Sequence, residues 1–261
     1  MRKDIMRGHW FVLALLAGTV ISGQPLAREA SGTTVGVKPD AKAAGAGGLR
    51  IIEIKGPIYM GDVITTDRRG QVQIIFVDDT KFVVGANSKV TIDAFVFNAN
   101  KTAQDVSISA VKGAFRFITG KSPKDNYSIR TPSMTIGVRG TAFDLAVRPG
   151  ESMVVVYEGQ TNLCDVLNRC MEANRGTMAA STQEGVRSVP AGADQRRRLE
   201  AYFPLIKSQA GLGAAFAVRL PANFAGGPTG DPGDKGTAGD KPEPKRPGPS
   251  PDPDGRPRPR L

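Results

Sequence analysis

The sequence predicts an all-β fold, in which short strands stack into a β-sandwich or a β-solenoid-like domain, followed by a short helical or irregular C-terminal appendix and a disordered tail. Between residues 51 and 189, runs of four to eight β-branched and aromatic residues recur, and each run ends at a turn residue. Glycines separate these runs at intervals of about ten residues, the spacing of turns in sandwiches, barrels and solenoids. The same region has no 3.6-residue periodicity, so a parallel α/β fold is disfavoured.

The first 27 residues have the organisation of a secretory signal peptide. Arg2 and Arg7 precede a twelve-residue apolar run at 10–21, and small or polar residues follow it. A membrane anchor is the alternative, but a helix of that length rises only about 18 Å, less than the roughly 30 Å of a bilayer core. We therefore expect a bacterial protein that is periplasmic or secreted and does not span the membrane after cleavage, with a mature chain that begins between residues 24 and 31.

Composition divides the rest of the chain into four segments. Residues 28–48 are rich in Gly, Ala and Lys and are predicted to be a flexible linker. Residues 49–190 carry the strand pattern and are predicted to be the folded β-domain, and residues 191–225 are its appendix. Residues 226–261 have no aromatic and almost no aliphatic side chains, so burial cannot offset their ordering entropy, and we expect a disordered tail.

The expected strands are 72–77, 81–84, 90–97, 106–111, 114–118, 134–138, 142–147 and 153–157. In 90–97, apolar residues alternate with polar ones, which indicates a strand with one buried face. Phe95 and Phe97 break this alternation toward the other face, so the second face is expected to be covered too. The residues expected to form the core along 142–147 are Phe143, Leu145 and Val147.

One short helix is expected, and it lies in the appendix. Asp194 is placed to cap it, Leu199 and Tyr202 supply apolar contacts, and Pro204 interrupts it. These apolar residues are expected to dock on the β-domain rather than on a partner. In the tail, glycines recur every three residues over 227–239, but five triplets are too few for a collagen-like triple helix, so this stretch is interpreted as a spacer.

The net charge of +10 raises the question of nucleic-acid binding. The excess of basic residues is spread thinly along the chain, and the one basic run is Arg196, Arg197 and Arg198. An exported chain meets little regulated nucleic acid, so no nucleic-acid partner is expected. The triplet is interpreted as the solvated face of the short helix, although an anionic envelope surface could also attract it.

The residue inventory excludes most catalytic and metal chemistry. The single histidine, His9, lies in the signal segment, so the mature chain would lack Ser-His-Asp and Cys-His catalysis and His-containing zinc sites. Cys164 and Cys170 form a matched pair in an oxidising compartment, with the turn-prone Asn168 between them. We expect a disulfide that staples a hairpin, and no catalytic residue, cofactor site or metal site.

Two further motifs are explained by turns. Asp78 and Asp79 could serve a hydrolase or bind calcium, but adjacent side chains on an extended chain point to opposite faces, so a turn between two strands is expected. The Gly-Lys-Ser at 120–122 has the form of the end of a phosphate-binding loop. The loop's first glycine would stand where the chain has Phe115, so that motif is absent.

The segment 129–144, Ile-Arg-Thr-Pro-Ser-Met-Thr-Ile-Gly-Val-Arg-Gly-Thr-Ala-Phe-Asp, resembles the signature of the FecR family, the periplasmic domain of ferric-siderophore-type transmembrane regulators. Gly-Asp-Val-Ile-Thr-Thr at 61–66 and Asp-Asp-Thr at 78–80 resemble the family's opening, and Val-Tyr-Glu-Gly at 156–159 resembles its closing strand. The resemblance covers residues 57–189. It implies an all-β domain of stacked short strands whose relatives bind protein partners or modulate signalling across the envelope.

Regulatory members of the family also carry a cytoplasmic sigma-factor-binding region and a full transmembrane helix before the periplasmic domain. The short segment before Trp10 holds neither. The resemblance therefore implies the domain without direct sigma-factor control.

Five residues of the motif form the candidate site, namely Pro132, Gly137, Arg139, Gly140 and Thr141. Pro132 fixes φ and lacks a backbone donor, and the two glycines bracket Arg139 in a predicted tight corner. Arg139 either hydrogen-bonds carbonyl groups of this corner, the role we expect, or projects as a partner contact.

Together these features favour an exported, non-enzymatic binding or regulatory module that contacts an envelope protein partner. The alternative is a structural or adhesive envelope protein that binds cell-wall or surface glycan. The sequence leaves the identity of the partner and the oligomeric state open.

Overall fold

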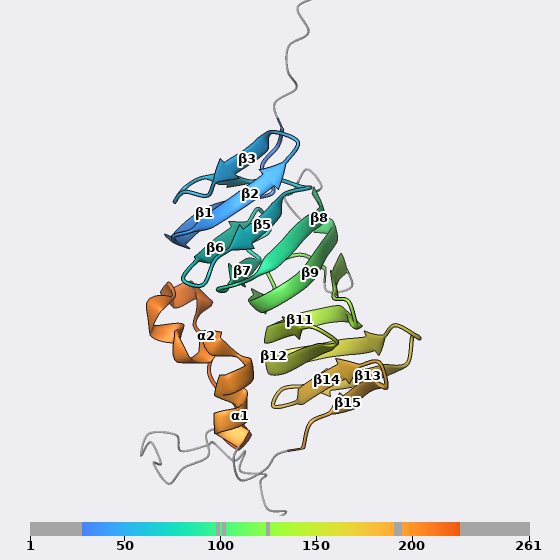
Figure 1. Ribbon diagram of the computed structural model, residues 1–261. Helices are drawn as coiled ribbons and strands as arrows, with labels where there is room; N and C mark the ends of the chain where they lie inside the picture. The colour runs from blue at the N-terminus through green and yellow to red at the C-terminus, as the bar shows by residue number, and fades with distance from the viewer. Residues whose placement is uncertain (1–27, 98–99, 101–102, 124–125, 191–194, 225–261) are drawn as a thin grey trace, which may run out of the picture. The chain divides into compact units, whose positions relative to one another are not determined.

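The computed structural model describes residues 28–97, 100, 103–123, 126–190 and 195–224 (Figure 1). The predicted signal peptide at 1–27, the helix cap Asp194 and the predicted tail at 226–261 lie outside these described residues.

The described residues form fifteen strands in one continuous mixed sheet, in which β9 and β10 are parallel. The strands of the N-terminal part are β1 (Gly32–Lys38), β2 (Ala41–Gly45), β3 (Gly48–Ile51), β4 (Pro57–Ile58), β5 (Val63–Thr66), β6 (Gln71–Phe76), β7 (Lys81–Val84) and β8 (Lys89–Phe97). They are followed by β9 (Ala103–Ile118), β10 (Tyr127–Arg130), β11 (Met134–Arg148), β12 (Glu151–Asp165), β13 (Cys170–Asn174), β14 (Met178–Thr182) and β15 (Gly185–Ser188). The all-β prediction is confirmed.

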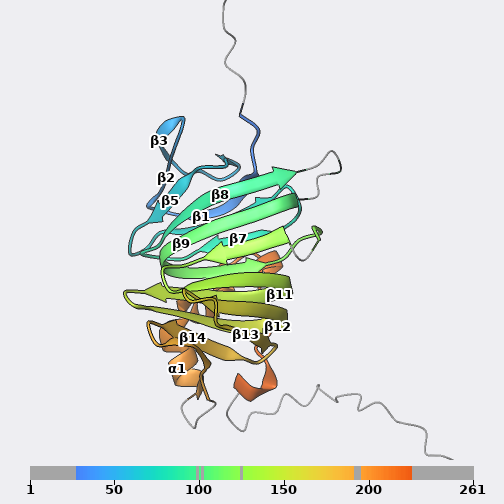
Figure 2. The ribbon, with the colours of Figure 1, turned by 90° about the vertical axis from the view of Figure 1, so that its right-hand side faces the viewer.

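The sheet folds over itself into two layers because its three longest strands take part in both. The first half of β9 pairs with β8 and β10, and its second half pairs with β7 and β11. Strands β11 and β12 divide in the same way. Layer A contains β3, β2, β5, β8, β10, β13 and one half of each long strand, and layer B contains β4, β1, β6, β7, β14, β15 and the other halves. Figure 2 shows the strands stacked one above another.

The core lies between the layers, where inward side chains of both form one buried cluster. Layer A contributes Ile64, Val90, Ile92, Ile108, Ile136 and Leu163, and layer B contributes Val72, Ile74, Phe82, Phe115, Phe143, Leu145, Val147 and Val154. Phe76 of β6 stacks on Phe95 of β8 with ring centroids 3.9 Å apart, which joins the two layers. The predicted core positions along β11 are thus confirmed.

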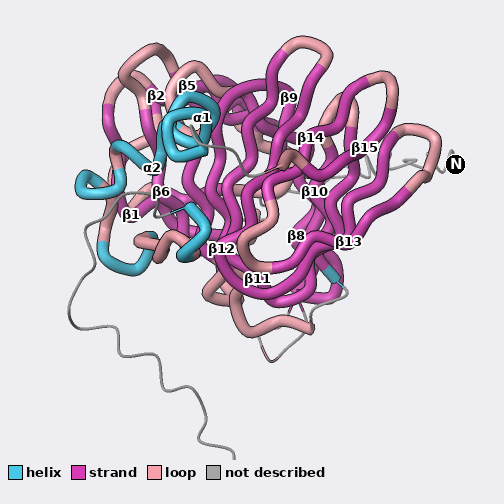
Figure 3. The backbone as a smooth tube through the Cα atoms, turned by 90° about the horizontal axis from the view of Figure 1, so that it is seen from below, coloured by secondary structure: helices cyan, strands magenta, loops and turns pink. Residues whose placement is uncertain are grey.

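The C-terminal appendix packs on the outer face of layer B (Figures 1 and 3). It contains α1 (Gln195–Tyr202), α2 (Pro204–Lys207) and three single 3₁₀ turns, η2 (Gln209–Gly211), η3 (Ala214–Phe216) and η4 (Ala222–Phe224). Leu199 and Phe203 contact the apolar outer side chains of β12 and β14, and Leu205 packs against Val83. The short helix and its docking on the β-domain are as predicted. No helix in the described part of the chain is long and apolar enough to cross a bilayer.

A buried ion pair fixes the appendix to layer B. Arg116 of β9 donates from Nε and Nη2 to the two carboxylate oxygens of Asp144 on β11, at 2.6 and 2.8 Å. Its Nη1 donates to Oε1 of Gln209 at 2.7 Å and to the carbonyl oxygen of Phe216 at 3.1 Å. The hydroxyl of Tyr157 donates to Asp144 at 2.9 Å, and burial raises the pKa of Tyr157 well above its usual value, so this donor keeps its proton.

Residues 28–48 are not a flexible linker, so that prediction is wrong. Strand β1 pairs with β6, β2 pairs with β5, and the side chains of Thr34, Ala41 and Ala43 are buried. The composition was misleading because small side chains are also buried between paired strands, as Ala41 and Ala43 are here. The β-domain therefore begins at Gly32 rather than at residue 49.

Four of the predicted strands are parts of two long strands. The runs 106–111 and 114–118 belong to β9, and 134–138 and 142–147 belong to β11. Glycines were interpreted as turns between separate strands, but Gly113 and Gly140 adopt positive φ inside continuous strands, at +113° and +68°. They allow each strand to pass from one layer to the other.

Replacing Asp144 by Ala should leave the Arg116 guanidinium buried without its partner. We expect the free energy of unfolding to fall by about 3–5 kcal/mol, as when one partner of a buried pair is removed. Urea denaturation measures this change.

Two further variants serve as controls for that loss. Glu200→Ala, which removes the surface ion pairs with Arg196 and Lys207, should cost less than about 1 kcal/mol. The double variant Arg116→Met, Asp144→Leu removes both charges and should lose less stability than Asp144→Ala. A double variant less stable than the single one would contradict the interpretation that an unpaired charge causes the loss.

Candidate functional site

The predicted site residues do not form one corner. Pro132 is exposed in the turn between β10 and β11, whereas Gly137, Arg139, Gly140 and Thr141 lie within β11. The prediction that the two glycines form a tight corner is therefore wrong. In its place, the register of β11 against β12 shifts between Arg139 and Ala142, which is a β-bulge at the passage between layers.

Only one of the two motif glycines is needed for backbone geometry. Gly140 has a φ of +68°, and Gly159 faces it on β12 with a φ of +70°. A Cβ atom on Gly159 would lie 2.0 Å from the carbonyl oxygen of Gly140, so the two strands cross here at backbone contact. Gly137 lacks a positive φ, and a Cβ atom there would meet Asn162 at an ordinary 3.8 Å.

Arg139 is exposed on the outer face of layer A, the face opposite the core. Side chains from β11, β12 and β13 surround it and line a hollow of about 210 Å³, which we call the polar hollow: Arg139, Gln160, Thr161, Asn162 and Glu172. Strand register explains the arrangement, since Arg139 lies opposite Gln160, and Asn162 lies opposite Glu172. The predicted bond from Arg139 to carbonyl groups of the motif stays a prediction.

Thr141 and Pro132 have different surroundings from Arg139. Thr141 is buried, and its carbonyl oxygen accepts a hydrogen bond from the backbone N–H of Thr119 at 3.0 Å, so it contributes to the core side of the bulge. The turn at Pro132 is held by Thr131, whose hydroxyl oxygen accepts from the backbone N–H of Met134 at 2.9 Å. Neither residue lines the polar hollow.

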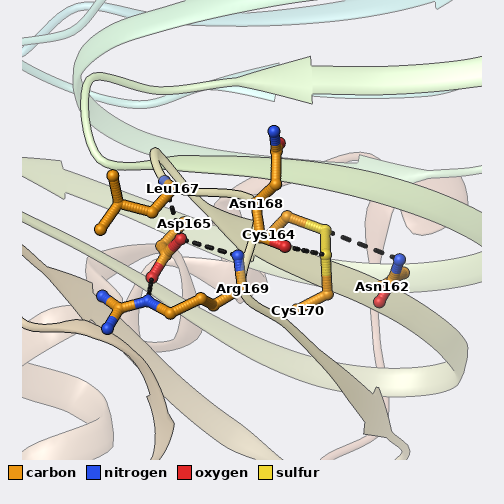
Figure 4. Close-up of a disulfide and its surroundings, with 7 residues drawn as sticks. All are labelled: Asn162, Cys164, Asp165, Leu167, Asn168, Arg169 and Cys170. Carbon is orange, nitrogen blue, oxygen red and sulfur yellow. Dashed lines mark hydrogen bonds and ion pairs between the residues drawn. A yellow bond between two sulfur atoms is a disulfide. The ribbon is translucent and has the colours of Figure 1, made fainter.

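The predicted disulfide between Cys164 and Cys170 is present and closes the β12–β13 hairpin (Figure 4). The two residues are paired across the hairpin with their Cα atoms 4.0 Å apart. Asn168 lies in the turn with a φ of +58°, as its turn-forming character suggested. The bridge therefore fixes one wall of the polar hollow, since Asn162 and Glu172 belong to the same hairpin.

Asp165 reinforces the same hairpin from inside its turn (Figure 4). One carboxylate oxygen accepts from the backbone N–H groups of Leu167 and Arg169, each at 2.9 Å, and the other accepts from Nε of Arg169 at 2.6 Å. Burial opposes ionisation of Asp165, but these hydrogen bonds outweigh it and lower its pKa. Arg169 also donates to the carbonyl oxygen of Glu184, which links the hairpin to the β14–β15 turn.

Asp78 and Asp79 lie in the turn between β6 and β7, as predicted. The carboxylate of Asp78 is buried and accepts from the hydroxyl groups of Ser122 at 2.7 Å and Tyr127 at 2.5 Å. Asp79 is exposed, with a φ of +65°, and pairs with Lys121 at 2.7 Å. The two carboxylates thus have separate structural partners. No group of three His, Cys, Asp or Glu side chains suited to a metal occurs among the described residues.

The segment between Asp62 and Asn162 matches the family model described as FecR protein. The chain contains a FecR domain. Two crystal structures of a candidate anti-sigma factor from Parabacteroides distasonis are similar at 15% and 14% identity, with TM-scores of 0.39 and 0.40. These matches cover 51% and 52% of this chain and 61% and 63% of that one, so about three-fifths of that protein's chain is matched. No curated protein matches this chain.

The matched FecR range extends from the residue before β5 to Asn162, three residues before the end of β12. It contains the glycine bulge, Arg139 and both members of the Arg116–Asp144 pair. The N-terminal strands β1 to β4, both disulfide cysteines, β13 to β15 and the appendix lie outside it. Members of the FecR family are regulatory proteins associated with the cell envelope.

The two motif glycines should respond differently to the same substitution. Gly140→Val places a β-branched residue at positive φ and should lower the free energy of unfolding by more than about 1 kcal/mol. Gly137→Val lies on extended, half-exposed backbone and should change it by less than about 0.5 kcal/mol. Chemical denaturation of both variants tests this, and equal losses would refute the assignment of strain to Gly140 alone.

Asp165→Asn should reduce stability in a pH-dependent way. The folded-state pKa of Asp165 is lowered, so its ionised form stabilises the fold above the unfolded pKa of about 3.9. That contribution disappears as the pH falls through the folded value. The difference in urea midpoint between parent and variant should therefore be clear at pH 7 and shrink toward zero in strong acid.

The matched control for this titration is Glu184→Gln, at an exposed carboxylate. It should alter the urea midpoint little at either pH. A parent–variant difference for Asp165→Asn that stays constant with pH would argue against a role for the ionised carboxylate.

Proposed function

We propose that this chain is an exported, non-enzymatic FecR-domain module of the bacterial envelope, which contacts a protein partner through the polar hollow around Arg139. The proposal includes a periplasmic or secreted location, reached through the predicted signal peptide. It does not include direct sigma-factor control, in line with the expectation from the sequence.

The observation that carries the proposal is the difference between the outer faces of the two layers. The outer face of layer B is apolar, holds a buried ion pair, and is covered by the appendix. Around the polar hollow, the outer face of layer A presents the exposed side chains of Arg139, Asn162 and Glu172 to solvent. Arginine is enriched at protein interfaces, because its planar guanidinium donates several hydrogen bonds in fixed directions.

The rigidity of the hollow also supports binding. All of its side chains lie on paired strands, and one wall belongs to the disulfide-closed hairpin. A preformed surface loses little conformational entropy when a partner binds. The buried carboxylates of Asp78 and Asp144 are hydrogen-bonded within a turn and beneath the appendix, which favours structural roles for both.

Arg139→Ala should weaken partner binding and lower the free energy of unfolding by less than about 1 kcal/mol, the usual limit for an interaction of an exposed charged side chain. The side chain is exposed, so its removal creates no cavity, while loss of a central contact can reach about 2 kcal/mol in binding. Affinity capture from envelope extracts with parent and variant as bait tests binding, and thermal melting tests stability. Arg187→Ala, an exposed arginine on β15 of layer B, is the matched control and should capture like the parent.

A variant that loses more than about 1 kcal/mol of stability and captures less would assign Arg139 to structure instead. The glycan alternative is tested in the same experiment. Retention of the parent on cell-wall polysaccharide, without a stoichiometric protein partner, would replace the proposed protein contact by glycan binding, for which amide and carboxylate groups such as Asn162 and Glu172 are also suitable.

A further inference from the structure

Three of the four edge strands of the described sheet are protected against pairing with another chain. The pairing network of the described strands ends at β3, β4, β13 and β15. Strand β4 has two residues and begins with Pro57, β13 presents the exposed Glu172, and β15 presents the exposed Arg187. Short length, proline and outward charge are the usual protections of an edge.

Strand β3, which has four residues, lacks both a proline and an outward charged side chain. Its side chains on the outer face are Leu49 and Ile51, which are 72% and 71% exposed. Its charged residue, Arg50, points to the other face and forms an ion pair with the buried carboxylate of Asp62, with Nη1 and Oδ1 3.0 Å apart. The strand lies at the N-terminal edge of the stack (Figure 1). It is therefore an open apolar edge whose only charge is already neutralised.

The backbone of β3 has hydrogen-bonding groups available at the open edge. In the β2–β3 ladder, Gly45 lies opposite Gly48 and Ala43 opposite Arg50. The N–H of Ile52 donates to the carbonyl of Ala41 at 3.0 Å, which identifies the alternate positions 48, 50 and 52 as those bonded to β2. The N–H and C=O groups of Leu49 and Ile51 consequently point away from β2. Among the described residues, β2 is the only strand that pairs with β3.

We propose that β3 pairs antiparallel with β3 of a second copy of this chain, about a twofold axis at Arg50. In this register Leu49 of one copy lies opposite Ile51 of the other, and the outward N–H and C=O groups of both residues form hydrogen bonds across the axis.

The side chains suit this self-pairing. The four exposed apolar side chains, two from each copy, would meet on one face of the joined sheet. The two Arg50 side chains would face each other, a repulsive arrangement for free charges, but each is paired with its own Asp62. Ile51 also borders a hollow of about 110 Å³, and the proposed register places Leu49 of the second copy opposite Ile51. The hollow is lined by Val37, Pro39, Asp40, Ala41, Lys42, Ile51 and Ile52.

The test is sedimentation of the purified protein over a range of concentrations. Because a four-residue edge buries a small area, we expect a weak dimer, with a dissociation constant of about 1 μM or above. The variant Leu49→Lys, Ile51→Lys should remain monomeric at concentrations at which the parent dimerises, a shift of at least about tenfold in the dissociation constant. Its melting temperature as a monomer should be unchanged, because both side chains are exposed.

The matched control is Val166→Lys, Leu167→Lys at the tip of the disulfide hairpin, where the side chains are 64% and 67% exposed. It removes equivalent apolar surface and adds the same charge, and it should dimerise like the parent.

The register has its own test by cross-linking. In the variant Leu49→Cys, Ile51→Cys, the new cysteines of two copies would have Cα atoms about 5.5 Å apart, within the range for a disulfide. Mild oxidation should give a covalent dimer. Leu49→Cys alone should not, because the two copies of position 49 are offset by two residues.

A parent that stays monomeric at all concentrations would overturn the proposal, even if a strand of another protein bound to β3. So would a lysine variant of β3 that dimerises as well as the parent, or a hairpin-tip variant that alone becomes monomeric. A dimer in which Leu49→Cys cross-links by itself would overturn the proposed register.

Discussion

The paired charges of Arg116 and Asp144 are the constraint on which the rest of the structure depends. Both side chains project from strands of layer B, away from the core, and both are buried. A guanidinium and a carboxylate lose hydration when they are buried, and they are tolerated only if every remaining donor and acceptor is satisfied. Gln209, Phe216 and Tyr157 satisfy them here, which makes the appendix a part of the β-domain rather than an addition to it.

A second constraint is the passage of three long strands between the layers. Without it, the chain would form two separate sheets that needed other connections. The bulge at Gly140 and Gly159 brings the backbones of β11 and β12 into contact and bends both strands. The inward side chains of β11 therefore belong to the core along the whole strand. Its outward side chains are exposed in layer A and covered in layer B. Arg139 and Asp144 are therefore five residues apart in the sequence but have opposite environments, one in solvent and one beneath the appendix.

Sequence reasoning predicted the all-β class, most strand positions, the core face of β11, the disulfide and the short docked helix. The prediction failed at positions where the residue types do not indicate the backbone conformation. The small residues of β1 and β2 have the composition of a linker, and only their pairing with β6 and β5 shows that they are strands. Gly137 and Gly140 are the same residue type in one motif, and only the register shift distinguishes them.

The ion pair itself was missed, although the sequence contained a signal for it. Arg116 lies between Phe115 and Phe117, and Asp144 lies between Phe143 and Leu145, so each charge interrupts an apolar strand. Alternation alone places such residues on the opposite face from the core, where solvent is the simpler expectation. Covering of that face depends on contacts more than ninety residues away, which no local pattern reveals.

That separation along the chain has a consequence for the order in which the molecule matures. The groups that complete the surroundings of Arg116 come 93 and 100 residues after it. A chain that is synthesised from its N-terminus can form most of the strands before Gln209 is available. In that interval, the apolar outer face of layer B remains exposed to solvent and accessible to proteases and to other chains. Packing of the appendix on layer B therefore requires nearly all of the described chain, and we expect that face to become protected from proteases only then.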